Sequence, residues 1–206
     1  MAADRGADRR GAGPPRIGSS GDAARPRARR FHRRTDWRFV RVARLDRVTD
    51  PLRPEHADEL APVLDDASLH RYIGGEPAGI EELRARVERQ VRGGSLDGRE
   101  RWLNWTVRER LTGRAVGTVQ ATVSGSERNL VAALAWVIGS THQGQGFAKE
   151  ATGVMASWLR ERGAGCLRAH IHPHHDASMA VARHIGLQPT NVMVDGELRW
   201  ESPQQR

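Results

Sequence analysis

The sequence contains a single cysteine, Cys166, and its longest uninterrupted apolar run spans only residues 130–138. One cysteine excludes an intramolecular disulfide and any zinc or iron–sulfur site built from clustered cysteines. A membrane-spanning helix needs about 20 apolar residues, so no run is long enough to cross a bilayer. The apolar stretch of a signal peptide is also missing. We therefore expect a cytoplasmic protein without a membrane partner.

The net charge of +8 is concentrated in the first 36 residues, which hold ten arginines and four aspartates. The rest of the chain has 23 basic and 21 acidic groups and is nearly neutral. The first segment has too few large apolar side chains to form a core. We predict a disordered basic tail over 1–36, a linker over 37–48 and one globular domain over 49–206. The tail could contact nucleic acid or the ribosome by counterion release; a solvated extension or an over-called start stays open.

Two helices are predicted before the first long strands. A short strand at Pro51–Pro54 leads into a helix with apolar residues at three- and four-residue spacing, which Pro62 should shorten or kink. These apolar residues are Leu60, Val63 and Leu64. A loop containing residues 72–75 follows, and a second helix over 81–91 ends at a glycine pair.

The middle of the chain is rich in β-branched and aromatic residues. Residues 102–108 and 115–123 are predicted to form a hairpin. Residues 130–138 form a continuous apolar strand, as expected for one covered on both faces. A polar loop then precedes a helix over 147–162. The core side of this helix carries Ala151, Val154, Met155 and Trp158 or Leu159.

A strand, a helix and a hairpin complete the chain. The strand covers residues 166–171 and the helix 176–185. The hairpin strands are 189–194 and 197–201, joined by Asp195-Gly196, a strong two-residue turn signal. Helices interleaved with strands around one sheet predict an α/β (α+β) fold.

The most informative segment for function is Gln143–Ala148, which lies between the apolar strand and the following helix. Its glycines allow a close backbone approach, and a helix N-terminus offers free N–H groups and the positive end of a dipole. The segment is a candidate phosphate or pyrophosphate site, although a plain glycine-rich connection stays open. The third glycine of a dinucleotide-binding fingerprint and the Gly-Lys-Ser/Thr of a P-loop are both missing.

This segment resembles the pyrophosphate loop of the GNAT superfamily of N-acetyltransferases, whose pattern is Arg/Gln-x-x-Gly-x-Gly/Ala. Gln143, Gly146 and Ala148 match it between the fourth strand and the following helix, as in the family. Pro173–Ser178, followed by Gly186-Leu187, is similar to the Pro-x-Asn-x-x-Ser and Gly-Phe/Leu of a subgroup that includes the ribosomal-protein alanine acetyltransferases. The resemblance covers about residues 49–201. It implies a mixed, mostly antiparallel sheet of six to seven strands with helices on both faces and the fourth and fifth strands splayed.

The resemblance also implies acetyl-CoA as co-substrate. The edge of the fourth strand would hold the pantetheine arm, the glycine loop the pyrophosphate, and the start of the helix at 176–185 the region of the sulfur. For Trp136, a role as a core aromatic stays open. The cofactor-binding candidates are Trp136, Val137, Ile138, Gln143, Gly144, Gln145, Gly146, Phe147, Ala148, His175 and Ser178.

Two positions depart from the family pattern. His175 replaces the asparagine that contacts the arm, and Ala182 stands where many members have a tyrosine that protonates the departing thiolate. Ser178 keeps the family's serine and is therefore the catalytic candidate for protonating the sulfur. Binding the arm or capping the helix are its alternative roles.

No single residue is identified as the general base that removes a proton from the acceptor ammonium. A water chain or a neutral amine can replace it. Four histidines lie close together in the sequence, but no zinc-enzyme pattern accompanies them, so no metal is expected. The base candidates are Asn104, Glu109, Glu127, His142 and His172, and the four histidines are His170, His172, His174 and His175.

The sequence thus predicts an N-acetyltransferase that moves the acetyl group of acetyl-CoA directly to a primary amine, at a peptide N-terminus or on a small molecule. Cys166 begins a strand, so no covalent enzyme intermediate is expected. By resemblance, the acceptor would be lined by Tyr72–Glu76, Trp102, Asn104 and Met193–Trp200. The alternative is a non-catalytic acyl-CoA-binding or regulatory module that contacts nucleic acid through the tail. A homodimer stays open.

Overall fold

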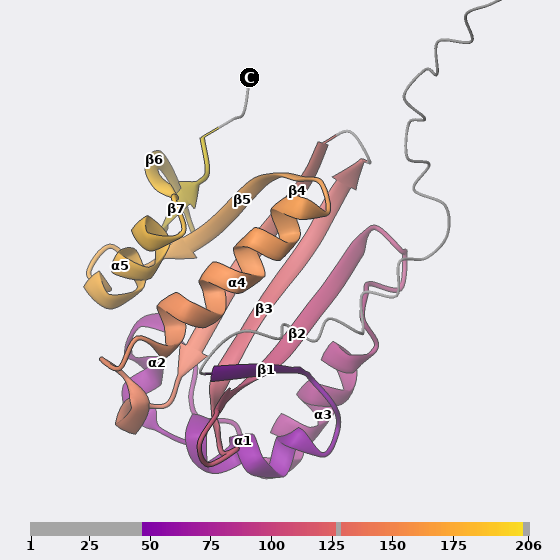
Figure 1. Cartoon of the computed structure of the whole chain (residues 1–206), viewed down its shortest axis with the longest axis vertical. Helices are drawn as coiled ribbons and strands as arrows, with labels where there is room; N and C mark the ends of the chain where they lie inside the picture. Colours follow the sequence, from indigo (N-terminus) through magenta and orange to yellow (C-terminus); the bar gives the residue numbers. More distant parts are fainter. Residues whose placement is uncertain (1–46, 127–128, 204–206) are drawn as a thin grey trace, which may run out of the picture. The chain divides into compact units, whose positions relative to one another are not determined.

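The computed structural model of the chain describes residues 47–126 and 129–203. The tail predicted at 1–36, most of the linker and Glu127 lie outside these residues. The described residues contain one sheet in the order β1-β2-β3-β4-β5-β7-β6 (Figure 1). Its strands are β1 (Arg47–Pro51), β2 (Glu100–Glu109), β3 (Ala115–Ser126), β4 (Asn129–Ile138), β5 (Ala164–Ile171), β6 (Gln188–Val194) and β7 (Glu197–Glu201).

The sheet is mixed and mostly antiparallel, as predicted. Only β4 and β5 run parallel to each other among the paired strands of the described residues. The β6–β7 hairpin turns at Asp195 and Gly196, whose φ angles of 50° and 82° fit a tight two-residue turn.

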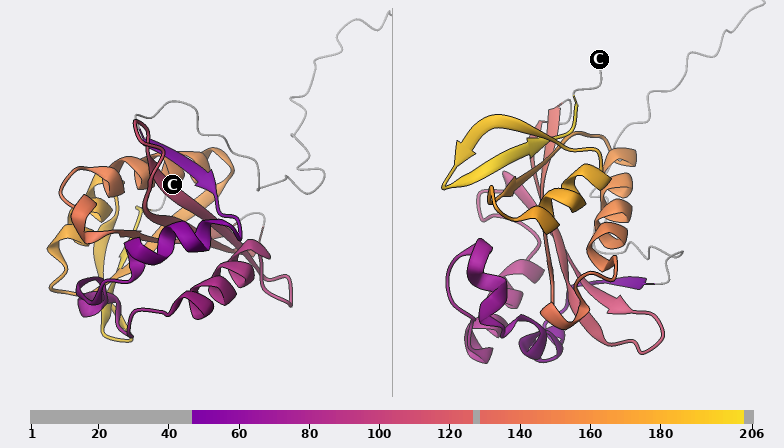
Figure 2. Two further views of the ribbon diagram at one scale, coloured as in Figure 1. Left: turned by 90° about the horizontal axis from the view of Figure 1, so that it is seen from below. Right: turned by 90° about the vertical axis from the view of Figure 1, so that its left-hand side faces the viewer.

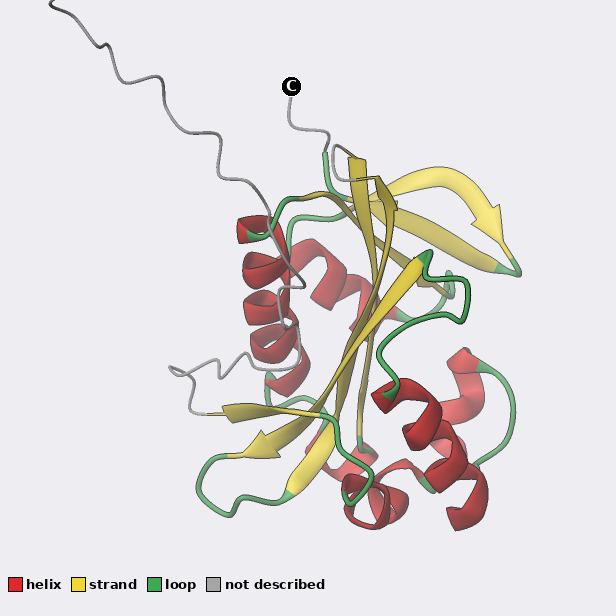
Figure 3. Cartoon of the chain, turned by 90° about the vertical axis from the view of Figure 1, so that its right-hand side faces the viewer, coloured by secondary structure: helices red, strands yellow, loops and turns green. Residues whose placement is uncertain are grey.

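Helices cover both faces of the sheet (Figures 2 and 3). The α4 face is the side on which α4 and α5 pack, and the α3 face is the opposite side, where α1, α2 and α3 lie. A short 3₁₀ turn, η1 (Ser140–His142), connects β4 to the glycine loop. The helices are α1 (His56–Leu64), α2 (Ala67–Ile73), α3 (Ile80–Val91), α4 (Phe147–Glu161) and α5 (Asp176–His184).

Helix α2 and strand β1 differ from the sequence prediction. The loop predicted to contain residues 72–75 begins instead as helix α2, capped by the Asp66 carboxylate, which accepts from the backbone N–H of Ser68 at 2.8 Å. A helix of seven residues is too short to establish an apolar period in the sequence, which is why it was missed. The first strand was predicted at Pro51–Pro54, but β1 covers Arg47–Pro51 and leaves residues 52–54 outside it. It begins inside the range predicted as linker, because Arg47 already pairs with Glu109 of β2.

The main core lies between the sheet and α4. Phe147, Ala151, Met155 and Leu159 of α4 are almost fully buried there, whereas Val154, which was predicted on the core side, is half-buried. Trp158 meets Trp105 of β2 edge to face, with ring centroids 5.9 Å apart. A smaller cluster lies on the α3 face and contains Leu52, Ala57, Leu60, Leu83, Val87 and Ala115.

Strand β4 is buried on one face only. Ala132, Leu134 and Ile138 lie in the main core, whereas Ala135, on the α3 face, is exposed. The prediction of a strand covered on both faces was therefore wrong. The reason is that α1 packs against β3 and α3 against β2, so that these helices stop short of β4.

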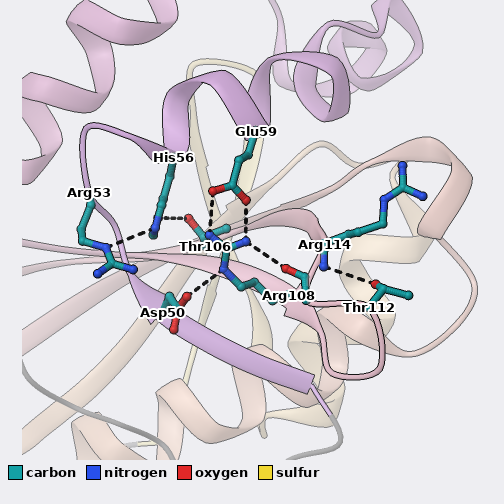
Figure 4. Close-up of polar contacts among 9 residues, drawn as sticks. Asp50, Arg53, His56, Glu59, Thr106, Arg108, Thr112 and Arg114 are labelled. Carbon is teal, nitrogen blue, oxygen red and sulfur yellow. Dashed lines mark hydrogen bonds and ion pairs between the residues drawn. The ribbon is translucent and has the colours of Figure 1, made fainter.

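A polar network joins β1, α1 and β2 (Figure 4). Arg108 of β2 donates through Nε to Asp50 of β1 at 2.7 Å. Its Nη1 and Nη2 donate to the two carboxylate oxygens of Glu59 on α1, at 2.5 and 3.1 Å. One guanidinium thus fixes the position of α1 on the sheet. Because its side chain is only 14% exposed, water screens these pairs less than it screens surface ion pairs.

The same network contains a buried histidine. His56 is 2% exposed, with Nδ1 2.8 Å from Thr106 Oγ1 and Nε2 accepting from Arg53 Nε at 3.3 Å. An arginine can only donate, so this geometry requires a neutral imidazole with its proton on Nδ1. Burial, followed by the charges of Arg108 and Arg53, lowers the pKa of His56.

Acidification should therefore destabilise the domain through His56. Below pH 6.5, the ordinary histidine value, the unfolded chain binds a proton that the folded chain resists, so stability is lost as the pH falls through this window. The melting temperature should fall more steeply in the wild type than in His56→Gln, whose amide can still donate to Thr106 and accept from Arg53. Thermal melts from about pH 8 to about pH 5 measure this, and parallel curves for the two proteins would contradict it.

Candidate active site

The segment Gln143–Ala148 forms the turn from β4 into α4. Gly144 and Gly146 have φ angles of 73° and 86°, in the left-handed region that glycine adopts without steric cost. Gly146 is the N-cap residue of α4 and offers no capping side chain. The first N–H groups of an α-helix have no acceptor inside the helix. The exposed loop in front of α4 can therefore receive an anion.

Side chains of this segment fix its backbone. Gln143 Nε2 donates to the carbonyl of Ile138 at 3.0 Å, and Gln145 Nε2 donates to the carbonyl of Thr141 at 3.2 Å. Phe147 is 2% exposed and lies in the main core. The Gln143, Gln145 and Phe147 side chains thus hold the loop in place, which leaves the backbone as the part of the segment suited to a phosphate.

Strands β4 and β5 separate beside this loop. Their ladder ends at the pair Ala133 and Arg168, and β4 continues to Ile138, while β5 beyond Arg168 pairs with β7. The splay implied by the resemblance is therefore present. The backbone edge of β4 over residues 136–138 lies beyond the ladder with β5. Trp136 itself is half-buried and packs against the main core, so its side chain serves the core.

His175 and Ser178 lie at the start of α5. His175 is the N-cap residue and Ser178 the third residue of the helix. The alternative in which Ser178 caps the helix was therefore wrong, because the cap position belongs to His175. Ala182 is fully buried in the main core, so a methyl group occupies the position where many family members carry a tyrosine.

The only tyrosine of the chain, Tyr72, reaches this region from α2. Its ring stacks on His175, with centroids 4.5 Å apart and planes 17° apart, and lies 5.5 Å from His172. Burial lowers the pKa of His175, the nearby His172 lowers it further and Asp176 opposes the shift. His175 is therefore uncharged at neutral pH. The sequence placed Tyr72 in an acceptor-lining loop, and its contact with His175 depends on the missed helix α2.

The four predicted general bases that lie within the described residues do not converge. Glu109 lies at the β2–β3 turn, bonded to a threonine of that turn, and Asn104 donates to the backbone of α3. His142 lies in η1 beside the glycine loop. His172 lies beside Tyr72, but its Nδ1 accepts from the backbone N–H of His174 at 3.2 Å. A neutral His172 then carries its proton on Nε2 and can donate there but not accept.

Four polar side chains gather on the α3 face, where β5 pairs with β7 next to the splay. Arg168 lies opposite Glu201 in the ladder and donates through Nε to its Oε1 at 2.7 Å. His170 lies opposite Arg199, whose Nη1 is 3.9 Å from the same Glu201 oxygen. Neither arginine is identifiable from the sequence, because only the register of β5 against β7 brings these residues together.

Cys166 also lies near this group. Burial raises the pKa of its thiol, and the Glu201 carboxylate raises it further. The cysteine is therefore protonated at neutral pH and lacks the thiolate character of a catalytic nucleophile. Within residues 47–126 and 129–203, no three His, Cys, Asp or Glu side chains are grouped so that they could hold a metal ion. No helix of that part of the chain has the length and hydrophobicity needed to span a membrane.

Comparisons with known proteins agree with this geometry. Residues 48–188 match the family model of the acetyltransferase (GNAT) domain. A search of curated proteins finds no significant match. Among solved structures, an acetyltransferase from Thermus thermophilus is 20% identical with a TM-score of 0.61, over 80% of this chain and 99% of the other.

Two further solved structures have named acceptors. A spermidine N-acetyltransferase from Vibrio cholerae, in complex with CoA and spermine, is 14% identical with a TM-score of 0.61, over 77% of this chain and 96% of the other. A ribosomal L7/L12 α-N-protein acetyltransferase in complex with CoA is 15% identical with a TM-score of 0.61, over 75% and 92%. These likenesses establish the fold. The family match covers more than half of the chain, which therefore belongs to the GNAT acetyltransferase domain family.

Proposed function

We propose that the protein is an acetyl-CoA-dependent N-acetyltransferase that transfers the acetyl group directly to a primary amine. The observation that carries the proposal is the pairing of two features at the C-terminal end of β4. The N-terminus of α4 behind its glycine loop suits a pyrophosphate, and the strand edge beyond the β4–β5 ladder suits an arm with amide groups. CoA contains both groups in one molecule.

In this proposal, the backbone of Gly144–Ala148 binds the pyrophosphate, and the edge of β4 at Trp136–Ile138 binds the pantetheine arm. The thioester end then points toward the pair Ala133 and Arg168, where β4 and β5 meet. His175 and Ser178, at the start of α5, lie toward the sulfur. Here an uncharged His175 replaces the family's asparagine as a hydrogen-bonding partner for the arm.

The proposed reaction joins two substrates, acetyl-CoA and the amine, without an acetyl-enzyme intermediate. The amine nitrogen attacks the thioester carbon, a C–N bond forms, and the C–S bond breaks. The CoA thiolate then takes a proton, for which Ser178 is our candidate donor, and the proton of the acceptor ammonium passes to solvent. A protonated Cys166 is consistent with this direct route, because an acetyl-enzyme intermediate would require a reactive thiolate.

The class of acceptor is supported by the fold relatives. Their names specify amines of two kinds, a polyamine and a protein N-terminus. The motif Pro173–Ser178 resembles the subgroup that includes ribosomal-protein acetyltransferases, so a peptide N-terminus or a small amine is the acceptor we propose. Binding of nucleic acid or the ribosome through the tail, and a homodimer, rest on residues or contacts outside the described part of the chain.

Two observations favour a second function, a non-catalytic acyl-CoA-binding module. Ala182 is buried, and the predicted bases within residues 47–126 and 129–203 do not converge. Incubation with acetyl-CoA and a panel of amines, with release of free thiol as the readout, separates the two. Amine-dependent thiol release supports the enzyme. If calorimetry detects CoA binding but no amine causes thiol release, the result supports the module. If the protein neither binds CoA nor releases thiol, both functions are excluded.

A further inference from the structure

The side chains of Arg168, His170, Arg199 and Glu201, here called the β5–β7 cluster, contain more hydrogen-bond donors than acceptors. Two guanidiniums share one carboxylate: Arg168 Nε holds Glu201 at 2.7 Å, while Arg199 reaches the same oxygen only at 3.9 Å. The second distance is too long for a hydrogen bond. The donors of Arg199 are therefore only weakly engaged by Glu201.

Two nitrogens of this cluster are buried without a partner. Arg199 Nε and His170 Nε2 have no hydrogen-bond partner among the described residues. The two residues lie directly opposite each other in the β5–β7 ladder, so both nitrogens belong to one place. In native structures most buried polar atoms have a hydrogen-bond partner. A buried atom without one can mark the place of a bound ligand.

The cluster lies beside the place proposed for the reaction. Arg168 is the last β5 residue of the β4–β5 ladder. His170 and Arg199 form the next pair on the same face of the sheet, past the point where β4 leaves. β5 and β7 are neighbours in Figure 1. The exposed Ala135 shows that the α3 face of the adjoining β4 is uncovered. An acceptor that approaches a thioester held in the splay from the α3 face therefore passes the cluster.

On the α3 face next to the splay, β4 and β3 carry no charged side chain. Across β4 and β3 the facing side chains are aliphatic or neutral and polar: Ala133, Ala135, Val137, Thr118, Gln120 and Thr122. On the β7 side, Glu201 is held by Arg168, and Glu197 lies two residues beyond Arg199 toward the hairpin turn, about 7 Å along the strand. Within the described part of the chain, Arg199 thus has a buried Nε without a partner and no hydrogen bond to the nearest carboxylate, Glu201.

We infer that Arg199, with His170, forms a subsite for a carboxylate of the acceptor, so that the protein favours amines carrying a carboxylate close to the reacting nitrogen. This inference rests on the proposed function. A guanidinium fork matches a carboxylate in two parallel hydrogen bonds, and the low exposure of Arg199, 26%, strengthens such a pair. The carboxylate can be the α-carboxylate of a free amino acid or an acidic side chain near a peptide N-terminus. Polyamines, which bring only positive charge to this cluster, are disfavoured.

The test measures binding of acetylated products to the CoA-saturated protein by calorimetry. Acetylated products carry no ammonium group, so attraction between an ammonium and Glu201 does not contribute to the measured affinity. The first pair is N-acetylmethionine and N-acetylmethioninamide; the second is N-acetyl-Ser-Asp-Ala-amide and N-acetyl-Ser-Asn-Ala-amide. In the wild type, the carboxylate member of at least one pair should bind about tenfold tighter than its amide, as expected for a charge-assisted contact. The pair that shows the preference identifies the source of the carboxylate.

Two variants in the cluster should act in opposite directions. The preference is the ratio of the affinity for the carboxylate member to that for the amide member of a pair. Arg199→Gln should lower this ratio to about one. Glu201→Gln should raise it, because the guanidiniums lose their shared counter-ion. If the cluster only stabilised the fold, both substitutions should change the carboxylate preference in the same direction. Arg84→Gln, which removes a guanidinium from an ion pair between α3 and Asp58 of α1, is the matched control and should leave the preference unchanged.

Equal binding of both members in both pairs, no detectable binding of either carboxylate, or a preference that survives Arg199→Gln overturns the inference. The outcome is independent of turnover. If no amine causes thiol release, but the wild type prefers the carboxylate and Arg199→Gln does not, the proposed function fails and the subsite stands. If amines are acetylated without any such preference, the function stands and the subsite fails.

Discussion

Gly146→Val should weaken CoA binding by at least about tenfold, or about 1.4 kcal/mol, while the domain stays folded. Gly146 has a φ of 86°, and a β-branched residue there is a steric outlier. Valine would therefore force the backbone out of the left-handed region at the point where, in the proposed CoA complex, the first N–H groups of α4 meet the phosphates. Calorimetric titration with CoA measures the effect.

The control must separate backbone strain from loss of the binding site. Gly163 follows α4 at its other end, has a φ of 92°, and an added Cβ there would have no atom within 4 Å. Gly163→Val therefore introduces comparable strain, about 1–2 kcal/mol, far along the helix from the loop. It should lower the melting temperature about as much as Gly146→Val does but leave CoA affinity at the wild-type value. Unchanged affinity in a folded Gly146→Val protein would remove the loop from the proposed CoA site.

The parts of the fold that the sequence predicted correctly depend on local patterns. The hairpin turn at Asp195-Gly196 needs two residues of positive φ, and few sequences other than Asp-Gly or Asn-Gly provide them. The glycine loop is similarly local, since Gln143–Ala148 supplies both the turn and the helix start. Helix α4 shows a long amphipathic period, and only its side position Val154 proved less buried than predicted.

The parts that were missed depend on contacts between distant segments. The sequence of β4 does not show that only one face of the strand is buried, because the residues on its α3 face are as apolar as those in the core. Ala135 is exposed because of where α1 and α3 pack on the sheet. The cluster of Arg168 with Glu201 joins residues from two strands, and a shift of one residue in register would separate them. The stacking of Tyr72 on His175 likewise requires a helix too short to show a period.

Ser178→Ala should lower turnover by about 10²-fold if the serine protonates the departing thiolate, within the usual range for an acid–base group. The reason is that Ala182, buried in the core, cannot supply a phenol, and Ser178 is a half-buried hydroxyl in the first turn of α5. CoA affinity should change little, because the pyrophosphate and arm contacts remain. Stability should also change little, since His175 and not Ser178 occupies the cap position. Steady-state turnover, CoA titration and thermal melts on this variant test the three statements together.

Two further variants decide between catalysis and binding. Ser178→Thr keeps a hydroxyl and should recover much of the turnover lost in Ser178→Ala. Ser157→Ala makes the same substitution on the exposed side of α4 and should change neither turnover nor affinity. If Ser178→Ala instead weakens CoA binding and leaves maximal turnover intact, the serine anchors the arm. If turnover equals that of the wild type at saturating acetyl-CoA, Ser178 is not the acid, and the proton reaches the thiolate from solvent, to which the uncovered face of β4 is open.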